Sequence, residues 1–201
     1  MIKTLQKDHA LQVARLHIDG ISTGFISSLG EKFVTALYES IAQSPHGFGL
    51  VDESDGKIVG FIAFTTNLKG LYKSILKKNI FRFGFLLFGK MFSWKTLKKI
   101  FETLFYPSRV ERQELPKAEL LSIVVADSER GKGIAKVLIE QGLKECHHRD
   151  ILEIKVLVAG FNEPANILYQ KTGFDRAAQI ENHGIVSNVY VVGTDHFLKS
   201  E

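Results

Sequence analysis

One stretch constrains this chain more than any other: an apolar run leads into a glycine-containing loop, and the loop opens a helical pattern. The run LLSIVV at residues 120–125 is followed by ADSERGKG and then by the amphipathic segment IAKVLIEQGLKECHHR. A second apolar run, ILEIKVLVA, follows at residues 151–159. Strand, helix and strand in this order predict a βαβ unit with parallel strands and a right-handed crossover.

The remaining segments add helices and strands on both sides of this unit. Two helices are expected in the first 45 residues, followed by an antiparallel hairpin around an Asp55-Gly56 turn. Helical spacing recurs at residues 71–80 and 94–105, which predicts a helical insertion at about residues 67–107. A helix from about Glu163 to Thr172 and two strands, near 174–180 and 186–193, complete a single α/β domain over residues 1–201 with a mixed sheet.

Composition excludes several classes of protein. With 45% apolar residues, 24% charged residues and four prolines, the chain is typical of a folded domain rather than a disordered one. The most apolar stretch, residues 83–89, is too short to cross a membrane, and the charged N-terminal segment does not resemble a signal peptide, so a cytoplasmic location is expected. Cys146 and its neighbours His147 and His148 lack the spacing of a metal site, so no metal is expected.

The insertion is basic and aromatic at once. It holds nine of the lysines and arginines against one acid, and seven of the fifteen phenylalanines, while the whole chain has a net charge of +4. Such a segment either forms helices with a solvated charged face or faces an anionic partner. Nucleic-acid binding is not expected, because no recognition helix or aromatic strand motif accompanies the charge.

The loop after the first apolar run predicts a phosphate-binding site. Backbone N–H groups at a helix N-terminus have no partner within the helix, and glycines let an anion approach them closely. The sequence RGKGIA at residues 130–135 is neither a Walker loop, which needs Lys-Ser or Lys-Thr, nor a dinucleotide fingerprint. A simple turn with two glycines remains the alternative on these residues alone.

Two motifs in this order make the chain resemble the Gcn5-related N-acetyltransferase (GNAT) superfamily. The family signature Q/R-x-x-G-x-G/A is matched by Arg130, Gly131, Lys132, Gly133, Ile134 and Ala135. The second motif, N-x-x-A-x-x-x-Y-x-x-x-G-F, is matched by Asn162, Ala165, Tyr169, Gly173 and Phe174. The resemblance covers roughly residues 1–66 and 118–193, and it implies a GNAT-like mixed central sheet with N-terminal helices, a βαβ cofactor unit and an insertion outside the common core.

The resemblance also implies acetyl-CoA as cosubstrate and a place for it. The pyrophosphate would lie on the loop amides beside Arg130 and Lys132, and the pantetheine arm would run between the two parallel strands where they separate. A bulge on the second strand would cause this separation, and the chain would leave the sheet near Asn162. The implied binding residues are Ile123, Val124, Val125, Arg130, Gly131, Lys132, Gly133, Ile134, Ala135, Asn162 and Tyr169.

The implied chemistry is direct attack of a primary amine on a thioester, without a covalent enzyme intermediate. The N–H of Val125 would stabilise negative charge on the thioester oxygen. Tyr169 matches the family tyrosine that protonates the departing thiolate.

An alkylamine is mostly protonated at neutral pH, so a group must remove its proton. Glu119 is the candidate base, because strict strand alternation places it on one face with Leu121, Ile123 and Val125. A water chain that includes Ser122 or His183 is the alternative.

The acetyl group needs an acceptor. We expect a primary amine of a small molecule, such as an amino sugar or a nucleotide-linked amino sugar, whose anionic groups a basic insertion would attract. The alternatives are a protein or peptide N-acetyltransferase, and a non-catalytic CoA-binding or membrane-surface module in which the basic helices bind anionic lipid.

Overall fold

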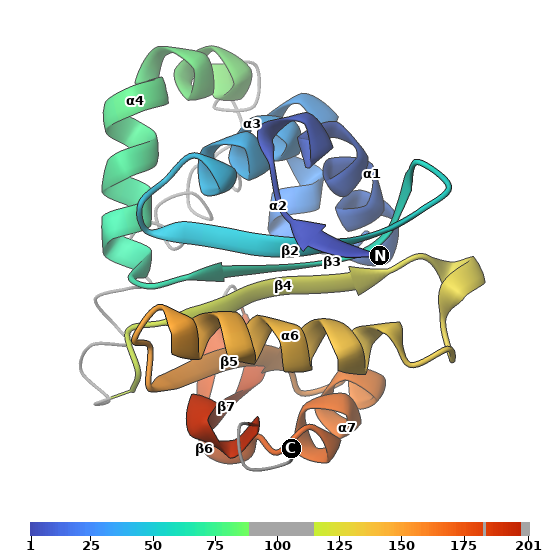
Figure 1. Cartoon of the computed structure of the whole chain (residues 1–201). Coiled ribbons are helices and arrows are strands. Elements are labelled where there is room, and N and C mark those ends of the chain that lie inside the picture. Colours follow the sequence, from blue (N-terminus) through green and yellow to red (C-terminus); the bar gives the residue numbers. More distant parts are fainter. Residues whose placement is uncertain (89–114, 183, 198–201) are drawn as a thin grey trace.

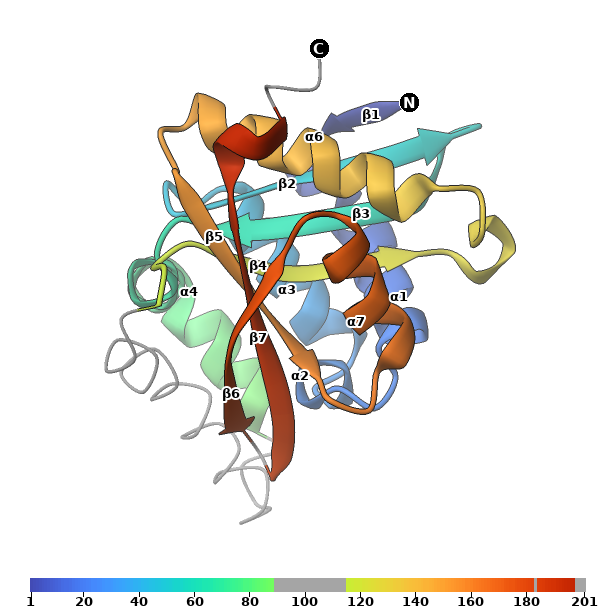
Figure 2. The same cartoon turned by 90° about the horizontal axis from the view of Figure 1, so that it is seen from below.

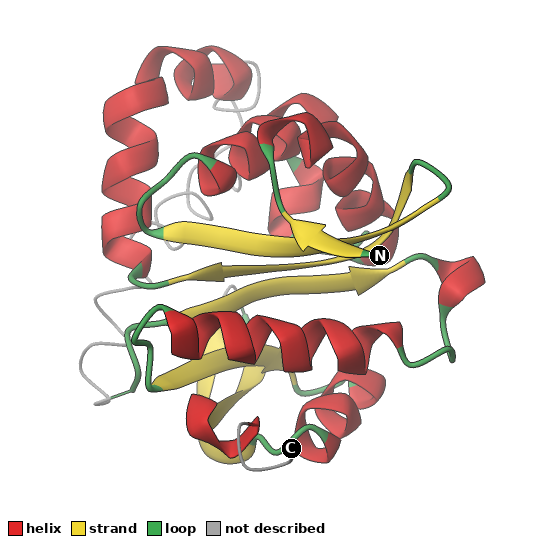
Figure 3. Cartoon of the chain, in the orientation of Figure 1, coloured by secondary structure: helices red, strands yellow, loops and turns green. Residues whose placement is uncertain are grey.

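The computed structural model describes residues 1–88, 115–182 and 184–197. The second expected helix of the insertion, at residues 94–105, and His183 lie outside the described residues. The described chain forms a seven-stranded sheet in the order β1-β2-β3-β4-β5-β7-β6. Helices cover both faces of this sheet, so the predicted α/β architecture with a mixed sheet is confirmed (Figures 1 and 3).

The bounds of most elements agree with the sequence patterns. The strands are β1 (Ile2–Thr4), β2 (Gly47–Ser54), β3 (Lys57–Thr65), β4 (Glu119–Val125), β5 (Glu153–Ala159), β6 (Asp175–Asn182) and β7 (Ile185–Gly193). The helices are α1 (Ala10–Gly20), α2 (Phe25–Ser28), α3 (Glu31–Ala42), α4 (Leu68–Phe88), α6 (Ile134–His148) and α7 (Glu163–Lys171). Short 3-10 turns lie at Lys7–His9, Asp127–Glu129 and Thr194–Phe197.

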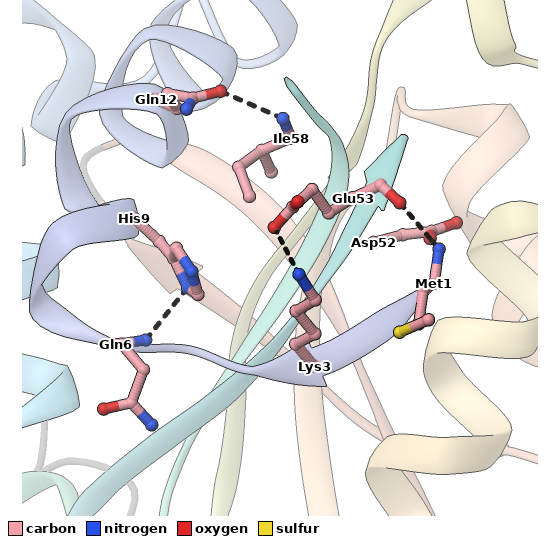
Figure 4. A network of polar contacts seen from close by, with 8 residues as sticks. All are labelled: Met1, Lys3, Gln6, His9, Gln12, Asp52, Glu53 and Ile58. Carbon is pink, nitrogen blue, oxygen red and sulfur yellow. Dashed lines mark hydrogen bonds and ion pairs between the residues drawn. The ribbon is translucent and has the colours of Figure 1, made fainter. Parts of the chain in front are cut away.

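The first three strands form the N-terminal edge of the sheet. Asp55 and Gly56 have φ of 51° and 73° in the turn between β2 and β3, which confirms the predicted hairpin. Strand β1 was not predicted, because three residues are too short for a periodic signal. It pairs with β2, where the Met1 ammonium and Lys3 each contact an acidic side chain of β2 at 2.8 and 2.9 Å (Figure 4).

Two apolar cores lie on opposite faces of the sheet. The α3-side core lies under α1, α3 and α4, and the α6-side core lies under α6 and α7 (Figure 1). Buried members of the α3-side core include Val13, Val34, Tyr38, Phe61, Leu71, Phe83 and Val124. Buried members of the α6-side core include Phe64, Leu120, Leu138, Leu143, Val156, Tyr169 and Phe174.

Helix α4 is longer than the predicted segment 71–80 and belongs to the core. It bends at Asn79, where φ and ψ are −132° and 19°, and continues to Phe88. Beyond the bend, Phe83 is buried and meets the ring of Phe33 edge-on at 5.1 Å. The first helix of the insertion thus packs against α3 as part of the α3-side core.

The predicted βαβ unit is present. Helix α6 connects β4 to β5, and these strands form the parallel pair of the described sheet. Their ladder contains only the pairs Glu119 with Lys155 and Leu120 with Val156. Beyond this point the two strands diverge, as the view from below shows (Figure 2).

Candidate active site

The loop between β4 and α6 turns at two glycines with left-handed backbone conformations. Gly131 and Gly133 have φ of 79° and 81°, a region that other residues rarely adopt. Gly133 is the N-cap of α6 and lacks a side-chain cap. A Cβ added at either glycine would meet nothing within 4 Å, so the surface of the loop is open to a ligand.

The amides of this loop are available to an anion. The N–H of Arg130 donates to the Asp127 carbonyl, and the next backbone N–H with a carbonyl acceptor is that of Val137, which donates to Gly133. Within the described residues, the N–H groups from 131 to 136 have no acceptor. Such a row of unpaired donors at the positive end of a 15-residue helix is suited to a phosphate.

The cations of the loop are paired with nearby acids. Arg130 contacts Asp127 at 2.8 Å, and Lys132 contacts Glu129 at 2.9 Å. Both cations are more than half exposed, and exposed pairs of this kind contribute about 0–1 kcal/mol. Unlike these side chains, the backbone N–H groups from 131 to 136 have no partner within the described residues.

A gap lined by backbone groups opens between β4 and β5. The N–H of Ala126 donates to Val59 on β3, so alternation turns the N–H and C=O of Val125 and Ile123 away from β3 and toward β5. On the facing strand, Gly160 donates to Val186 on β7, which turns the polar groups of Leu157 toward β4 in the same way. Because the β4–β5 ladder ends at Leu120, these groups face the gap instead of each other.

The separation of the strands was predicted, but its cause was assigned to the wrong strand. The pairing of β5 with β7 is regular along its whole length. The irregularity lies on β4, where Ser122 pairs with Ala63 and Leu120 with Phe64, which leaves Leu121 as an extra residue. The bulge is therefore at Leu121, directly before the part of β4 that borders the gap.

The bulge also changes which side chains of β4 share a face. Leu121 packs against the α3-side core, whereas Ile123 and Val125 pack against the α6-side core. The prediction that Glu119, Leu121, Ile123 and Val125 share one face is wrong, because it assumed unbroken alternation.

Glu119 lies at the start of β4 in a buried ion pair. Its carboxylate is 3.4 Å from the ammonium of Lys155 on β5, and both side chains are less than a tenth exposed. Lys155 also donates a hydrogen bond to the Pro116 carbonyl. Burial lowers the pKa of Lys155, and Glu119 partly offsets this effect. The carboxylate adds to burial in raising the pKa of Tyr72 on α4. The next residue, Leu120, packs in the α6-side core, so alternation places the Glu119 side chain on the α3 side of the sheet.

Tyr169 lies on the opposite side, in the α6-side core. Its ring packs edge-on against Phe174 at 5.2 Å and lies 6.3 Å from Tyr190. Ile123 and Val125 border the same core, so Tyr169 lies on the α6 side of the strand that lines the gap. Burial raises the pKa of Tyr169, so its hydroxyl stays protonated at neutral pH and can donate.

Asn162 caps the helix that carries Tyr169. Its side-chain oxygen accepts from the N–H of Ala165 at 3.3 Å, which stabilises the start of α7. At the other end, Gly173 has φ of 79°, and the N–H of Phe174 donates to the Tyr169 carbonyl at 3.0 Å. These contacts give the motif residues Asn162, Gly173 and Phe174 a role in holding α7.

Asn166 fastens α7 to the sheet and was not identified from the sequence. Its side-chain N–H groups donate to the carbonyls of Ala159 and Asn162, and its oxygen accepts from Asn188 and from the Tyr190 hydroxyl at 2.8 and 2.9 Å. The residue lies one position after Ala165 of the motif. Its only signal in the sequence is that it is a polar residue on the buried side of an amphipathic helix.

A buried chain of polar side chains reaches β4 from the α3 side. His17 Nδ1 lies 2.7 Å from the Tyr38 hydroxyl, which lies 2.8 Å from the Ser122 hydroxyl. Burial lowers the pKa of His17 to about 4, so its ring is neutral at neutral pH. Burial raises the pKa of Tyr38, although its contact with Ser122 lowers it. Ser122, a candidate member of a water chain, is thus joined to two residues that sequence analysis did not select.

The sequence was compared with models of protein families to identify the family of this chain. Residues 18–174 match the model of the "Acetyltransferase (GNAT) family". The chain belongs to the GNAT family. The match spans both motifs and extends across most of the chain, so it confirms the resemblance that the sequence indicated.

Solved structures share the GNAT fold over almost the whole chain. An N-acetyltransferase from Staphylococcus aureus aligns with a TM-score of 0.62 and 17% identity, covering 96% of this chain and 98% of its own. The ribosomal-protein-S18-alanine N-acetyltransferase from Escherichia coli gives 0.62 and 14%, covering 96% and 93%. Arabidopsis thaliana NAA60 in complex with acetyl-CoA gives 0.59 and 14%, covering 96% and 97%. No curated protein sequence matches the chain.

Three further features of the described residues concern metal binding, thiol chemistry and membrane spans. Within the described part of this GNAT protein, no group of three or more His, Cys, Asp or Glu residues is arranged to hold a metal ion. Cys146 is buried in α6, and burial raises the pKa of its thiol to about 12. Among the helices that the structure describes, none is long and apolar enough to cross a membrane.

Proposed function

We propose that this GNAT acetyltransferase transfers an acetyl group from acetyl-CoA to a primary amine of a small, anionic molecule, such as a nucleotide-linked amino sugar. The observation that carries the choice of a small acceptor is the position of α4. Phe83 on α4 is buried in the α3-side core, and Leu86 packs against the same core. Leu157 of β5 and Ile180 of β6 pack against it from the sheet.

This packing supports a confined acceptor space. On the α3 side, Phe83 and Leu86 of α4 pack in the same core as Leu121 of β4 and Leu157 of β5, the two strands that border the gap. A peptide acceptor needs an open groove, whereas a small amine needs only a pocket. The packing of α4 beside these strands therefore favours the small acceptor.

The charge of α4 supports an anionic acceptor. The 21 residues of α4 include five lysines and arginines and no acid. Lys73 and Lys77 are exposed on its surface. A basic helix beside the acceptor space raises the local concentration of anions, and this steering weakens as salt is added.

The residues around the gap fit acetyl-CoA. The unpaired amides from 131 to 136 and the open space over Gly131 and Gly133 suit the pyrophosphate. The backbone groups of Ile123 and Val125 that face the gap suit the amides of the pantetheine arm. Bound acetyl-CoA supplies an activated acetyl group as a thioester.

The chain's own groups then have distinct roles in the proposed reaction. The N–H of Val125 is directed into the gap and stabilises negative charge on the carbonyl oxygen. The protonated hydroxyl of Tyr169 donates a proton to the sulfur from the α6 side. Glu119 remains the candidate base on the α3 side, acting on the amine through water, since Lys155 occupies part of its carboxylate.

The test is thiol release from acetyl-CoA with a panel of acceptors. The panel contains a UDP-linked amino sugar, glucosamine 6-phosphate, glucosamine, spermidine and peptides with free N-terminal Ala or Met. We expect turnover with the anionic amino sugars, less with glucosamine, and a rise in KM with added salt for the anionic acceptors only.

Peptide acetylation is the competing outcome. Two of the similar structures are an N-acetyltransferase for a ribosomal protein and NAA60, but at 14% identity they establish the fold alone. Turnover with the peptides and with none of the small amines would contradict the proposed acceptor class. Absence of thiol release with every acceptor, combined with binding to anionic vesicles, would favour the membrane-surface module instead.

A further inference from the structure

The polar chain His17–Tyr38–Ser122 joins three elements beneath the sheet. His17 lies on α1, Tyr38 on α3 and Ser122 on β4, and the two contacts of 2.7 and 2.8 Å are in the normal range for hydrogen bonds. His17 and Tyr38 are buried, whereas Ser122 is only partly buried. Of the three residues, Ser122 is thus the one at the accessible end of the polar chain.

The polar chain lies in apolar surroundings that restrict its geometry. The ring of Phe61 meets Tyr38 edge-on at 5.2 Å and stacks on His17 at 6.4 Å. A buried polar group is costly unless it is hydrogen-bonded, so His17 and Tyr38 must satisfy each other and Ser122. The Tyr38 hydroxyl therefore has little freedom to rotate, and it restricts the hydroxyl of Ser122 in turn.

The accessible end of the polar chain, Ser122, lies at the edge of the gap between β4 and β5. Ser122 follows the bulge residue Leu121 and precedes Ile123, the first residue whose backbone groups face the gap without a β5 partner. The Ser122 side chain is on the α3 side, as its contact with Tyr38 requires. Tyr169 lies on the α6 side, so the two hydroxyl groups are on opposite faces of the strand that borders the gap.

We propose that Ser122 accepts a hydrogen bond from the acceptor amine and that Tyr38 is the residue that positions it, with His17 fixing the direction of the chain. This inference rests on the proposed acetyltransferase function. A neutral His17 with its proton on Nε2 accepts from Tyr38 through Nδ1. Tyr38 then accepts from the Ser122 hydroxyl, which leaves the lone pairs of Ser122 for an N–H of the amine. The amine is thereby oriented on the face opposite Tyr169, where the departing sulfur takes its proton.

The test compares Tyr38→Phe, Ser122→Ala and the double variant, using acetyl-CoA and whichever amine of the panel the wild-type protein turns over fastest. Each single variant should lower kcat about tenfold, as expected for one well-aligned hydrogen bond, and leave the KM of acetyl-CoA unchanged. If Tyr38 acts only through Ser122, the double variant should be no slower than Ser122→Ala. Ser122→Thr keeps the hydroxyl and should recover most of the lost kcat.

The matched control is Ser40→Ala. Ser40 is a buried residue of α3 two positions from Tyr38, and its hydroxyl donates to the Ala36 carbonyl outside the polar chain. This variant should retain the wild-type kcat.

Two results would overturn the inference while leaving the proposed function intact. One is an active wild-type protein whose kcat is unaffected by Tyr38→Phe. The other is a double variant whose decrease in kcat equals the product of the two single decreases, with each decrease in kcat proportional to the loss of thermal stability. A network with a purely structural role would give this result. A wild-type protein that releases no thiol with any amine would instead contradict the proposed function itself.

Discussion

The ammonium group of Lys155 lies 3.4 Å from the carboxylate of Glu119, at the first of the two residue pairs that join β4 and β5 before the strands diverge. Each charge is almost fully removed from solvent, and each comes from a different strand of the pair. The contact therefore lies at the closed end of the gap and joins the two strands that border it.

Removal of one partner of this pair should be strongly destabilising. Lys155→Met would break the buried ion pair with Glu119, and breaking such a pair costs up to about 3–5 kcal/mol. Urea unfolding of wild type and variant measures the difference in the free energy of unfolding.

The matched variant removes both charges. Lys155→Met combined with Glu119→Gln should recover most of the lost stability, because neither charge of the pair then has to be buried. A single Lys155→Met variant as stable as wild type would show that the contact contributes little to the fold.

Gly133→Val should abolish tight binding of acetyl-CoA. The substitution places a branched side chain in the open space over the loop amides, where the pyrophosphate is proposed to lie. We expect an increase in Kd of more than tenfold by isothermal titration calorimetry.

A second glycine provides the control for backbone strain. Gly56 lies in the β2–β3 turn with φ of 73°, close to the 81° of Gly133, and it also has open space around it. A side chain in this region costs about 1–2 kcal/mol at either position. Gly56→Val should therefore destabilise the fold to a similar degree and bind acetyl-CoA normally, and equal affinities for the two variants would contradict the assignment of the loop.

The loop could be predicted from the sequence because its signal is local. Within 15 residues, a buried strand is followed by two glycines and the start of a helix. The conformations of Gly131 and Gly133 depend mainly on their neighbours in the chain. The same holds for the Asp55-Gly56 turn and for the end of α7 at Gly173. In these places the backbone geometry follows from the residue type.

The bulge and the polar chain could not be predicted in this way. The extra residue Leu121 exists only because of how β4 pairs with β3, and strict alternation gave the wrong faces. Tyr38 and Ser122 are 84 positions apart, and His17 and Tyr38 read in the sequence as members of helical patterns. Contacts between distant elements leave no periodic signal in one sequence, so the residues on the α3 side of the gap required the structure.

Tyr169→Phe should lower kcat about 10²-fold, in line with the contribution of a general acid, and leave acetyl-CoA affinity unchanged. The substitution removes only the hydroxyl, so the packing against Phe174 is kept. Steady-state thiol release together with calorimetry separates the two effects, and a variant with wild-type kcat would remove Tyr169 from the chemistry.

The pH dependence of this step follows from the burial of Tyr169. Burial raises the pKa of the Tyr169 hydroxyl above the ordinary tyrosine value of about 10, so it stays protonated throughout the neutral and mildly alkaline range. Loss of the Tyr169 proton should therefore cause no decline of kcat in that range. A decline below pH 10 that disappears in Tyr169→Phe would contradict this assignment.

The burial of His17 should make the fold sensitive to mild acid. Its pKa is about 4 in the folded protein and near the ordinary 6.5 when unfolded, so between these values the unfolded chain binds the extra proton. The contribution of His17 to the free energy of unfolding is then fully present above pH 6.5. It falls by about 3 kcal/mol as the pH is lowered toward 4. His17→Gln cannot gain the proton, so its free energy of unfolding should fall less over this range, as measured by urea titrations at several pH values. The control His148→Gln, at an exposed position of α6, should keep the wild-type dependence, and parallel curves for wild type and His17→Gln would show that His17 does not cause the acid sensitivity.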